Sequence, residues 1–391
     1  MSAGGLSFGR TMMGQTQFSS TKFSNSKPWI ELSREAYLHN AAMISKMSGG
    51  KPVLAVLKNN AYGLGDVQVS NILDQSPHIF GIAVVKDDRA LAMRKSGVRK
   101  PILLMGDFDQ ENGAELVSSG VTLSVYSEDS FIKIRSLAEN YSEKIKVALY
   151  IDTGLGRMGM PYQEVPSVAE RIANIPNLKI EQTFSTLTTP KDFASQQIER
   201  FEQVVRQLAS DNIPVGTKHL APSYSILDIP ESHQDVVRPG ILLHGSFPMS
   251  DMSEAQIHPL KPAYRLKASV IRLEKLRKGD TIGFSRFYEV NEDEWIATLP
   301  IGWADGYNSG AENGAKVLLG GNLYSVVNVN ASHTNVSLGD KTNIKVGDIA
   351  TLIGSEKDEI TPEGFGKLVN GHNYLQINYK ESIPKQVYEA F

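Results

Sequence analysis

One lysine of this chain stands where an amine can do covalent chemistry. Lys58 follows the apolar run 53–57 and precedes a polar turn that ends at Gly63. Five consecutive apolar residues after Pro52 and before such a turn predict a strand that is buried on both faces. An ammonium group at the end of that strand is partly desolvated, which lowers its pKa and frees the amine to form a Schiff base with a carbonyl compound. The same pattern also fits a solvated lysine that merely ends a strand, so both interpretations stay open.

Two other segments carry groups that suit anions. The glycines of segment 151–159 allow the backbone to approach a ligand closely, and Arg157 offers a planar fork that matches a carboxylate. Further along, Gly240 follows Arg238 and Pro239. A glycine amide is a good phosphate donor because no side chain blocks the approach. The chain thus has a candidate nucleophile and two candidate anion-binding segments.

The elements that must position these residues alternate between strands and helices. Apolar strand-like runs recur with helical patterns between them, at 79–85, 101–106, 121–126, 145–152, 178–185, 218–221 and 236–245. With the Lys58 strand they make about eight strand-then-helix units, which predicts a (β/α)8 TIM-type barrel with ligands at the C-terminal ends of its strands. An open, doubly wound sheet is the alternative. No Gly-x-Gly-x-x-Gly motif follows an early strand, which argues against the dinucleotide-binding form of that sheet.

The pattern changes from Tyr264 onward. Apolar and polar residues alternate over 264–270, and short strand-like runs follow at 295–299, 317–319, 324–329 and 349–353. This predicts a small all-β domain after the barrel. We therefore expect an α/β protein in three parts, namely a flexible N-terminal extension over residues 1–27, the barrel over residues 28–260 and the C-terminal β domain over residues 261–391.

The composition limits the partners and the compartment. A chain of 391 residues, 41% of them hydrophobic, can bury a large core. A net charge of −3 gives no reason to expect nucleic acid or an anionic membrane as a partner, and no apolar run is long enough to span a bilayer. The absence of cysteine excludes disulfides and thiolate metal sites, and we predict no metal site. We expect a cytoplasmic protein, although residues 1–27 leave an organellar or exported location open.

Several strings of the sequence resemble the alanine racemase family of pyridoxal 5'-phosphate (PLP) enzymes. They are 55–65, similar to the family's PLP-lysine segment, then 151–159, 219–223 and 237–245 in the barrel, and 278–280, 300–307 and 345–348 in the C-terminal part. The resemblance implies the fold of that family, pyridoxal 5'-phosphate as the cofactor and a small amino acid as the substrate. It also implies a homodimer in which the partner subunit completes each active site.

The same resemblance implies a role for each matched residue. Lys58 would bind PLP as a Schiff base and act as an acid/base on one face of the substrate, and Arg157 would hold the substrate carboxylate. Arg238 would face the pyridine nitrogen. Since a guanidinium does not readily give up a proton, that nitrogen would stay unprotonated and PLP would be a weaker electron sink. The residues implied to bind the cofactor phosphate are Tyr62, Ser223, Gly240, Ile241 and Tyr374.

Other positions depart from the family's pattern. Phe284 aligns with the tyrosine that serves as the second acid/base of these racemases, and a phenyl ring cannot carry a proton. Tyr150 aligns with a lysine that is modified in many members of the family, and Ser185 with a histidine that packs on the pyridine ring. The residues that stay open as a substitute base are Tyr288, after a shift of the alignment, His333 and Tyr307.

We predict a racemase-like enzyme that acts at Cα of a free amino acid bound to PLP as an external aldimine, with Lys58, Arg157 and His333 as its candidate catalytic residues. Phe284 leaves two alternatives. One is chemistry that needs a single base, such as aldol cleavage, β-elimination or decarboxylation, and the other is a PLP-binding protein without turnover. The smaller residues at Ser309, Ala331 and Ser332 favour a substrate larger than alanine.

Overall fold

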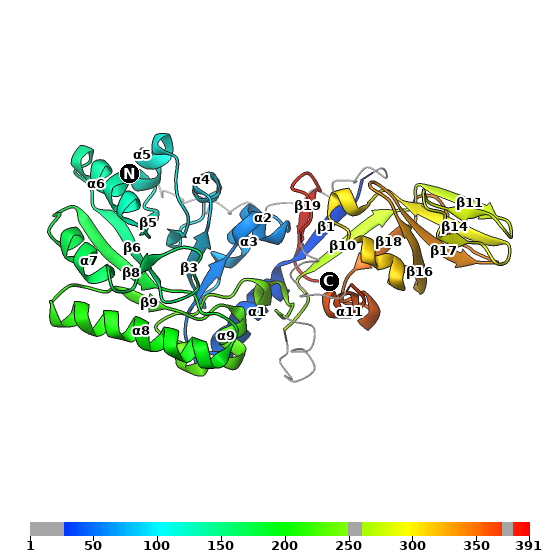
Figure 1. Cartoon of the computed structure of the whole chain (residues 1–391). Coiled ribbons are helices and arrows are strands. Elements are labelled where there is room, and N and C mark those ends of the chain that lie inside the picture. The colour runs from blue at the N-terminus through cyan, green and yellow to red at the C-terminus, as the bar shows by residue number, and fades with distance from the viewer. Residues whose placement is uncertain (1–26, 249–259, 370–377) are drawn as a thin grey trace, which may run out of the picture.

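The structure, a computed structural model, describes residues 27–248, 260–369 and 378–391. Figure 1 shows two lobes side by side, an α/β lobe and a C-terminal lobe built mainly of strands. Of the predicted N-terminal extension, all but Lys27 lies outside the described residues, and so does Tyr374. The predicted flexible extension and the predicted role of Tyr374 therefore stay predictions.

A ring of parallel strands forms the centre of the first lobe. Its hydrogen-bonding order is β2-β3-β4-β5-β6-β8-β9. The strands are β2 (Val53–Val56), β3 (Ile79–Val84), β4 (Ile102–Leu104), β5 (Thr122–Val125), β6 (Ile145–Asp152), β8 (Leu178–Phe184) and β9 (Thr217–His219), while the short β7 (Met160–Pro161) pairs with the end of β6. Most of their residues are buried, as expected for a parallel sheet that is covered by helices.

An irregular segment, residues 236–239, closes the ring between β9 and β2. The amide of Leu54 donates to the carbonyl of Val237 at 2.8 Å, and the amide of Arg238 donates to the carbonyl of Ala221 at 2.8 Å. Pro239 has no amide hydrogen, so this segment cannot form a full ladder. The predicted α/β fold, a TIM-type barrel followed by an all-β domain, is confirmed.

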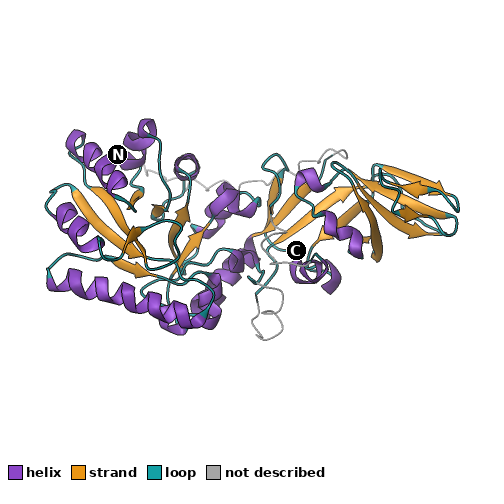
Figure 2. Ribbon diagram, in the orientation of Figure 1, coloured by secondary structure: helices purple, strands orange, loops and turns teal. Residues whose placement is uncertain are grey.

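Helices cover the outside of the barrel (Figure 2). They are α1 (Arg34–Met47), α3 (Asp66–Leu73), α4 (Asp87–Lys95), α5 (Gly113–Ser118), α6 (Glu128–Asn140), α7 (Val165–Ala173), α8 (Lys191–Ser210) and α9 (Ser223–Asp228), with the 3-10 turns η1 (Gln110–Asn112), η2 (Pro230–Ser232) and η3 (Ile241–His244). Local sequence explains their starts: the Ser33 hydroxyl accepts from the amide of Ala36 at 3.2 Å and caps α1. The longest, α8, buries Phe201 and Leu208 on its apolar face.

The C-terminal lobe is a sheet in the order β11-β14-β17-β16-β15-β18-β10-β1-β19. Its strands are β1 (Trp29–Ser33), β10 (Tyr264–Ser269), β11 (Arg272–Leu276), β14 (Glu294–Leu299), β15 (Lys316–Leu319), β16 (Asn322–Val329), β17 (Thr334–Gly339), β18 (Ile349–Ile353) and β19 (Lys385–Tyr388). A separate hairpin joins β12 (Thr281–Ile282) to β13 (Tyr288–Glu289), and the short helical elements are η4 (Trp303–Asp305), η5 (Ser309–Asn313), η6 (Asp358–Ile360) and α11 (Pro362–Leu368).

Strand β1 links the two lobes. It pairs antiparallel with β10 and parallel with β19, so residues 29–33 belong to the C-terminal sheet, although the predicted boundary counted them with the barrel. The chain therefore enters the C-terminal sheet first, builds the barrel, and then returns to complete the sheet.

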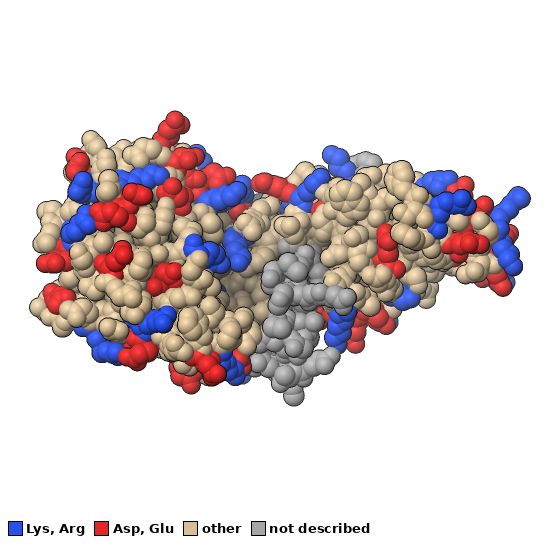
Figure 3. Space-filling model, in the orientation of Figure 1, with Lys and Arg blue, Asp and Glu red and all other residues tan. Residues whose placement is uncertain are grey.

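Charges on the surface are mixed. Figure 3 shows acidic and basic side chains interspersed over the face in view, in keeping with the small net charge. Within the described ranges, no helix is long and apolar enough to cross a membrane. The same part of the chain contains no group of three or more His, Cys, Asp or Glu residues that could hold a metal ion.

Candidate functional site

A pocket of about 550 Å³ opens at the C-terminal ends of the barrel strands. This is the end at which (β/α)8 barrels bind their ligands. The predicted site residues that line it are Lys58, Tyr62, Arg157, Ser223, Arg238, Gly240 and Ile241. They come from segments far apart in the sequence, so the fold brings the candidate nucleophile and both candidate anion-binding segments together. Their individual roles stay predictions.

The residues after Lys58 form a left-handed turn. Asn59, Asn60, Ala61 and Tyr62 have φ values of 51°, 55°, 49° and 60°. This conformation costs about 1–2 kcal/mol for each residue that carries a Cβ, although asparagine tolerates it better than most. Strain of this kind persists only where the surrounding structure enforces it, and it is concentrated at functional sites. Here the turn brings the Lys58 Nζ to 5.5 Å from the centre of the Tyr62 ring.

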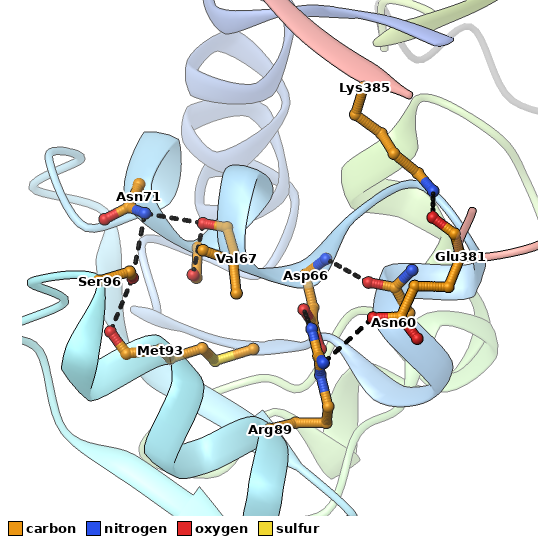
Figure 4. Close-up of polar contacts among 10 residues, drawn as sticks. Asn60, Asp66, Val67, Asn71, Arg89, Met93, Ser96, Glu381 and Lys385 are labelled. Carbon is orange, nitrogen blue, oxygen red and sulfur yellow. Dashed lines mark hydrogen bonds and ion pairs between the residues drawn. The ribbon is translucent and has the colours of Figure 1, made fainter. Parts of the chain in front are cut away.

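Contacts behind the pocket enforce this turn (Figure 4). The side-chain oxygen of Asn60 accepts from the amide of Asp66 at 3.0 Å. The buried carboxylate of Asp66 is held by two guanidinium nitrogens of Arg89, with Nε at 2.7 Å from Oδ2. Arg89 also binds Glu381 at 3.2 Å, so a residue near the end of the chain joins the same network.

The C-terminal segment before β19 packs directly on the turn. Gly63 has φ +88°, and a Cβ on it would lie 2.3 Å from the carbonyl oxygen of Tyr379. The segment is closed by Lys385, whose Nζ donates to the carbonyls of Lys380 at 3.2 Å and Glu381 at 2.8 Å. Only glycine fits at position 63 because the backbone of the C-terminal segment occupies the space of a side chain.

The amine of Lys58 is activated by its surroundings. Burial, and then the nearby Arg157 cation, lower its pKa below the ordinary 10.5. Burial disfavours the charged ammonium, and a like charge adds to that effect. A larger fraction of the amine is therefore neutral near pH 7 than in a solvated lysine, which is the form that attacks a carbonyl.

Tyr62, Ser223 and Gly240 meet at one side of the pocket. The amide of Gly240 donates to the Ser223 hydroxyl at 3.0 Å, and a Cβ on Gly240 would lie 2.1 Å from the Tyr62 hydroxyl. Ser223 begins α9 and Ile241 begins η3, and amides in the first turn of a helical element have no acceptor within it. Burial raises the pKa of Tyr62, so its phenol stays a neutral donor. Such donors together suit a phosphate.

Arg238 is a buried cation fixed by neutral acceptors. Its Nη2 donates to the carbonyl of Ser185 at 2.5 Å and of Leu220 at 3.2 Å, and its Nη1 lies 3.3 Å from Nδ1 of His219. Burial lowers the pKa of Arg238 to about 10, so it remains charged near pH 7. Burial and the Arg238 charge hold the pKa of His219 well below its ordinary range, which keeps that ring neutral.

The loop after β6 presents Arg157 to the pocket. Asp152 at the end of β6 accepts from the amides of Gly154 at 2.8 Å and Leu155 at 2.9 Å, which fixes the curve of the loop. Within the described ranges, no carboxylate forms an ion pair with Arg157. Its guanidinium is therefore available to an anionic ligand.

The pocket suits PLP by charge and shape. Three cations, Lys58, Arg157 and Arg238, line it, and none of the lining residues in the described chain is Asp or Glu. PLP carries a phosphate dianion and an amino acid carries a carboxylate. The positive charge of the pocket therefore complements both the cofactor and the substrate. A Cβ at Gly240 would collide with the Tyr62 hydroxyl, so glycine at this position leaves room for that predicted phosphate donor.

Four other predicted positions lie in the C-terminal lobe and are not among the described residues that line the pocket. Phe284 is fully exposed, at 100%. His333 is exposed and lies 2.8 Å from the Ser332 hydroxyl. Tyr307 is buried beside Phe365. The Tyr288 hydroxyl donates to Glu294 at 2.7 Å. Within one chain, none of them accompanies Lys58.

The structure places two barrel residues, Tyr150 and Ser185, differently from what the family alignment suggests. Tyr150 lines the pocket, and its ring stacks on that of Phe184 at 4.3 Å. Ser185, which we aligned with a ring-stacking histidine, is absent from the lining and its hydroxyl lies 2.8 Å from that of Thr153. Phe184 faces the barrel interior instead. Alternation along β8 is the signal that separates these neighbours, since successive residues of a strand point to opposite faces.

Comparison with known proteins identifies the family. The model of the alanine racemase N-terminal domain matches residues 32–248, and that of the alanine racemase C-terminal domain matches residues 263–387. The alanine racemase of Clostridium kluyveri is 31% identical over 337 residues, which are 84% of this chain and 85% of that protein. The one from Carboxydothermus hydrogenoformans is 30% identical over 365 residues, 91% of this chain and 98% of that protein.

Solved structures agree with these matches. The alanine racemase of Clostridium difficile 630 superposes with a TM-score of 0.84 at 26% identity and covers 94% of this chain and 97% of that one. A histidine racemase from Leuconostoc mesenteroides subsp. sake superposes with a TM-score of 0.82 at 25% identity and covers 93% of this chain and 98% of that one. With both domains matched on one barrel and one C-terminal sheet, the chain belongs to the alanine racemase family.

Proposed function

We propose that this protein is a PLP-dependent amino-acid racemase that acts at Cα of a free amino acid. The observation that carries the proposal is the Lys58 amine, its pKa lowered by burial and by Arg157, in a pocket lined by two further cations. Relatives named alanine racemase and a structural neighbour named histidine racemase support the reaction class without fixing the amino acid.

Each pocket residue has a separate task in this proposal. Lys58 attaches the cofactor and moves the α-proton on one face. Tyr62 and Ser223, with the amides of Gly240 and Ile241, hold the phosphate, and Tyr374, which lies outside the described residues, is proposed to assist them. When bound, PLP supplies the electron sink that makes the α-proton acidic.

Arg238 limits what the cofactor can do. Its hydrogen bonds to carbonyl groups fix the guanidinium, and a pKa of about 10 keeps it charged near pH 7. Were the pyridine nitrogen of PLP to face Arg238, the charged guanidinium would not protonate it, and PLP would be a weaker electron sink. We infer that side reactions that need a strong sink, such as transamination, are suppressed.

Arg157 sets the substrate class. A free guanidinium at the pocket binds the carboxylate of an α-amino acid bidentately, which fixes the position of Cα. The other lining residues include Met105, Met158 and Leu187, so the side chain of the substrate meets an apolar wall. We propose a free amino acid with a side chain larger than that of alanine.

A second copy of the chain is proposed as the partner. In the C-terminal lobe Phe284 and Phe287 are 100% and 86% exposed, and Trp303 is 57% exposed. Large exposed aromatic groups of this kind mark interaction surfaces. We propose that this aromatic face, defined by these three residues, contacts the other subunit of a homodimer and brings the candidate residue His333 toward its active site. Sedimentation analysis of the purified protein tests the dimer.

One observation favours a second candidate function. A phenyl group at Phe284 cannot carry a proton, so an enzyme that relied on this position would have one base only. Aldol cleavage, β-elimination or decarboxylation would then replace racemisation. A protein that binds PLP without turnover is the remaining alternative.

One experiment separates these functions. The protein is loaded with PLP and incubated with single enantiomers of amino acids in deuterium oxide, and the products are analysed for chirality and deuterium. Interconversion with deuterium at Cα supports the proposal. Cleavage products or one-face exchange alone would support the single-base alternative, and a yellow protein that changes no amino acid would support the carrier. Absence of the absorbance of attached PLP would refute all three.

A further inference from the structure

The pocket contains a second proton-carrying group opposite Lys58. Lys58 follows β2, and Tyr150 lies near the end of β6. Between these strands lie β3, β4 and β5 on one side of the ring, and β8, β9 and the closing segment 236–239 on the other. The two residues therefore rise from opposite walls of the barrel and line one pocket.

Tyr150 is held firmly and its hydroxyl is free. Its ring lies 4.3 Å from that of Phe184 at 24°, and Phe184 in turn stacks on His219 at 5.0 Å and 13°. No residue of the described chain forms a hydrogen bond with the Tyr150 hydroxyl, and the residue lines the pocket. A fixed ring with an unoccupied hydroxyl is preorganised for a ligand.

The binding of the substrate carboxylate would place Cα near Tyr150. Arg157 comes from the loop that follows the same strand β6, and Cα is one bond away from the carboxylate. Tyr150 and Arg157 both lie within electrostatic range of Arg238, since the first raises and the second lowers its pKa. Lys58 is likewise coupled to Arg157. The four groups therefore line one pocket and interact electrostatically across it.

Other tyrosines are poorer candidates. The Tyr62 hydroxyl is directed at Gly240 and the predicted phosphate site. The side chain of Tyr224, which also lines the pocket, interacts electrostatically with Lys191 outside the barrel strands. Phe284 has no proton to give.

We propose that Tyr150 is the second acid/base of the reaction and exchanges the α-proton on the face opposite Lys58. This rests on the proposed racemase function. In one direction the neutral Lys58 amine takes the α-proton and the Tyr150 phenol donates its own to the opposite face. The amine ends protonated and the phenol ends as phenolate, and a proton passed from one to the other through pocket water restores both. The reverse direction uses the same groups in opposite order.

The test compares Tyr150→Phe with wild type in three measurements. The first is the absorbance of attached PLP and its trapping by borohydride at Lys58, which should be unchanged. The second is exchange of the α-hydrogen of each enantiomer in deuterium oxide, which should persist for one enantiomer with retention of configuration. The third is interconversion, which should fall by roughly 100-fold or more. Tyr126→Phe is the control, because Tyr126 packs in the same barrel cluster without lining the pocket.

Three outcomes would overturn the proposal. They are interconversion by Tyr150→Phe at a rate close to wild type, equal loss of exchange for both enantiomers, and one-face exchange by the wild type itself. Should Tyr150→Phe fail to fold, Tyr150→His serves instead, because an imidazole also carries a proton. Interconversion with a pH optimum shifted toward the pKa of histidine supports the role, and an unshifted profile refutes it. A wild type that attaches no PLP or exchanges no α-hydrogen refutes the proposed function itself.

Discussion

The barrel mouth and the aromatic face of the C-terminal lobe differ in how complete they are within one chain. At the barrel mouth, Lys58, Arg157 and Arg238 line one pocket. On the aromatic face, Phe284 is wholly exposed and lines a smaller pocket, of about 230 Å³, with Phe287 and Trp303. The barrel mouth holds its candidate reactive groups within one chain, whereas the aromatic face has the exposed side chains of a surface that contacts another molecule. This contrast predicts that cofactor attachment needs one barrel alone, whereas the aromatic face acts through the proposed dimer.

Replacing Lys58 should have the largest effect. Lys58→Ala removes the only predicted attachment point, so attached PLP should be undetectable by absorbance and interconversion should be lost. Lys86→Ala is the matched control, because Lys86 is an exposed lysine just after the next strand, β3. Retained attachment in Lys58→Ala would contradict the assignment of the barrel mouth.

Replacing Arg157 should weaken the binding of the substrate and leave the binding of the cofactor unchanged. Loss of a charge-assisted bond worth about 1.5–3 kcal/mol predicts a KM that is roughly 10- to 150-fold higher for Arg157→Ala. PLP absorbance should stay as in wild type. Arg171→Ala, which removes an exposed ion pair with Glu128, is the control. A normal KM in Arg157→Ala would remove this residue from the site.

Replacing Arg89 should lower stability. Arg89→Ala leaves the buried carboxylate of Asp66 without its cation, which costs about 3–5 kcal/mol. The free energy of unfolding is measured by urea denaturation. Arg135→Ala, at an exposed i,i+4 pair with Glu139, should cost about 0.5 kcal/mol or less. An equal loss of unfolding free energy in both variants would show that the network behind the turn stabilises the protein no more than an exposed ion pair does.

The pH dependence of PLP attachment should reveal the lowered pKa of Lys58. Since the neutral amine reacts, the rate should rise with pH around a midpoint below the ordinary 10.5. Arg157→Ala should move that midpoint upward, because a neighbouring positive charge no longer disfavours the ammonium. Stopped-flow absorbance measures this without turnover. A midpoint that Arg157→Ala lowers would mean that the two groups do not interact as described.

Phe284→Tyr should have the smallest effect on the wild-type background. If Tyr150 already carries the second proton, a new phenol on the aromatic face adds little to interconversion. In the Tyr150→Phe background the same change becomes informative, and restored interconversion would show that the aromatic face of one subunit reaches the pocket of another. Chiral chromatography after a fixed time compares the four proteins.

Much of the site could be predicted because its residues follow strand ends. Lys58 closes an apolar strand, and Arg157 lies in the loop after another, so the barrel rule alone predicts that they meet. The eight-fold alternation likewise predicted the barrel. The pairing of β1 with β10 and β19 could not be predicted, since the five residues of β1 do not indicate which strands they pair with.

The position of Tyr150 in the pocket lining could not be predicted from the sequence either. Comparison with the family marks it only as a missing lysine, and nothing in its sequence neighbours indicates that its ring stacks on Phe184 of the adjacent strand β8. Burial and stacking depend on residues that are far apart in the sequence. The shift between Ser185 and Phe184 has the same origin, because an alignment compares letters and not the face of a strand to which each side chain points.

The close approach of Tyr379 to Gly63 has a consequence for biosynthesis. Because the backbone of Tyr379 supports the strained loop after β2, the ribosome must synthesise the barrel and most of the C-terminal lobe before that loop has its final support. We expect nascent chains, and chains truncated before Tyr379, to contain a formed barrel that captures the vitamin-derived aldehyde poorly. Synthesis of the segment around Tyr379 would thereby decide when the pocket becomes competent to bind its cofactor.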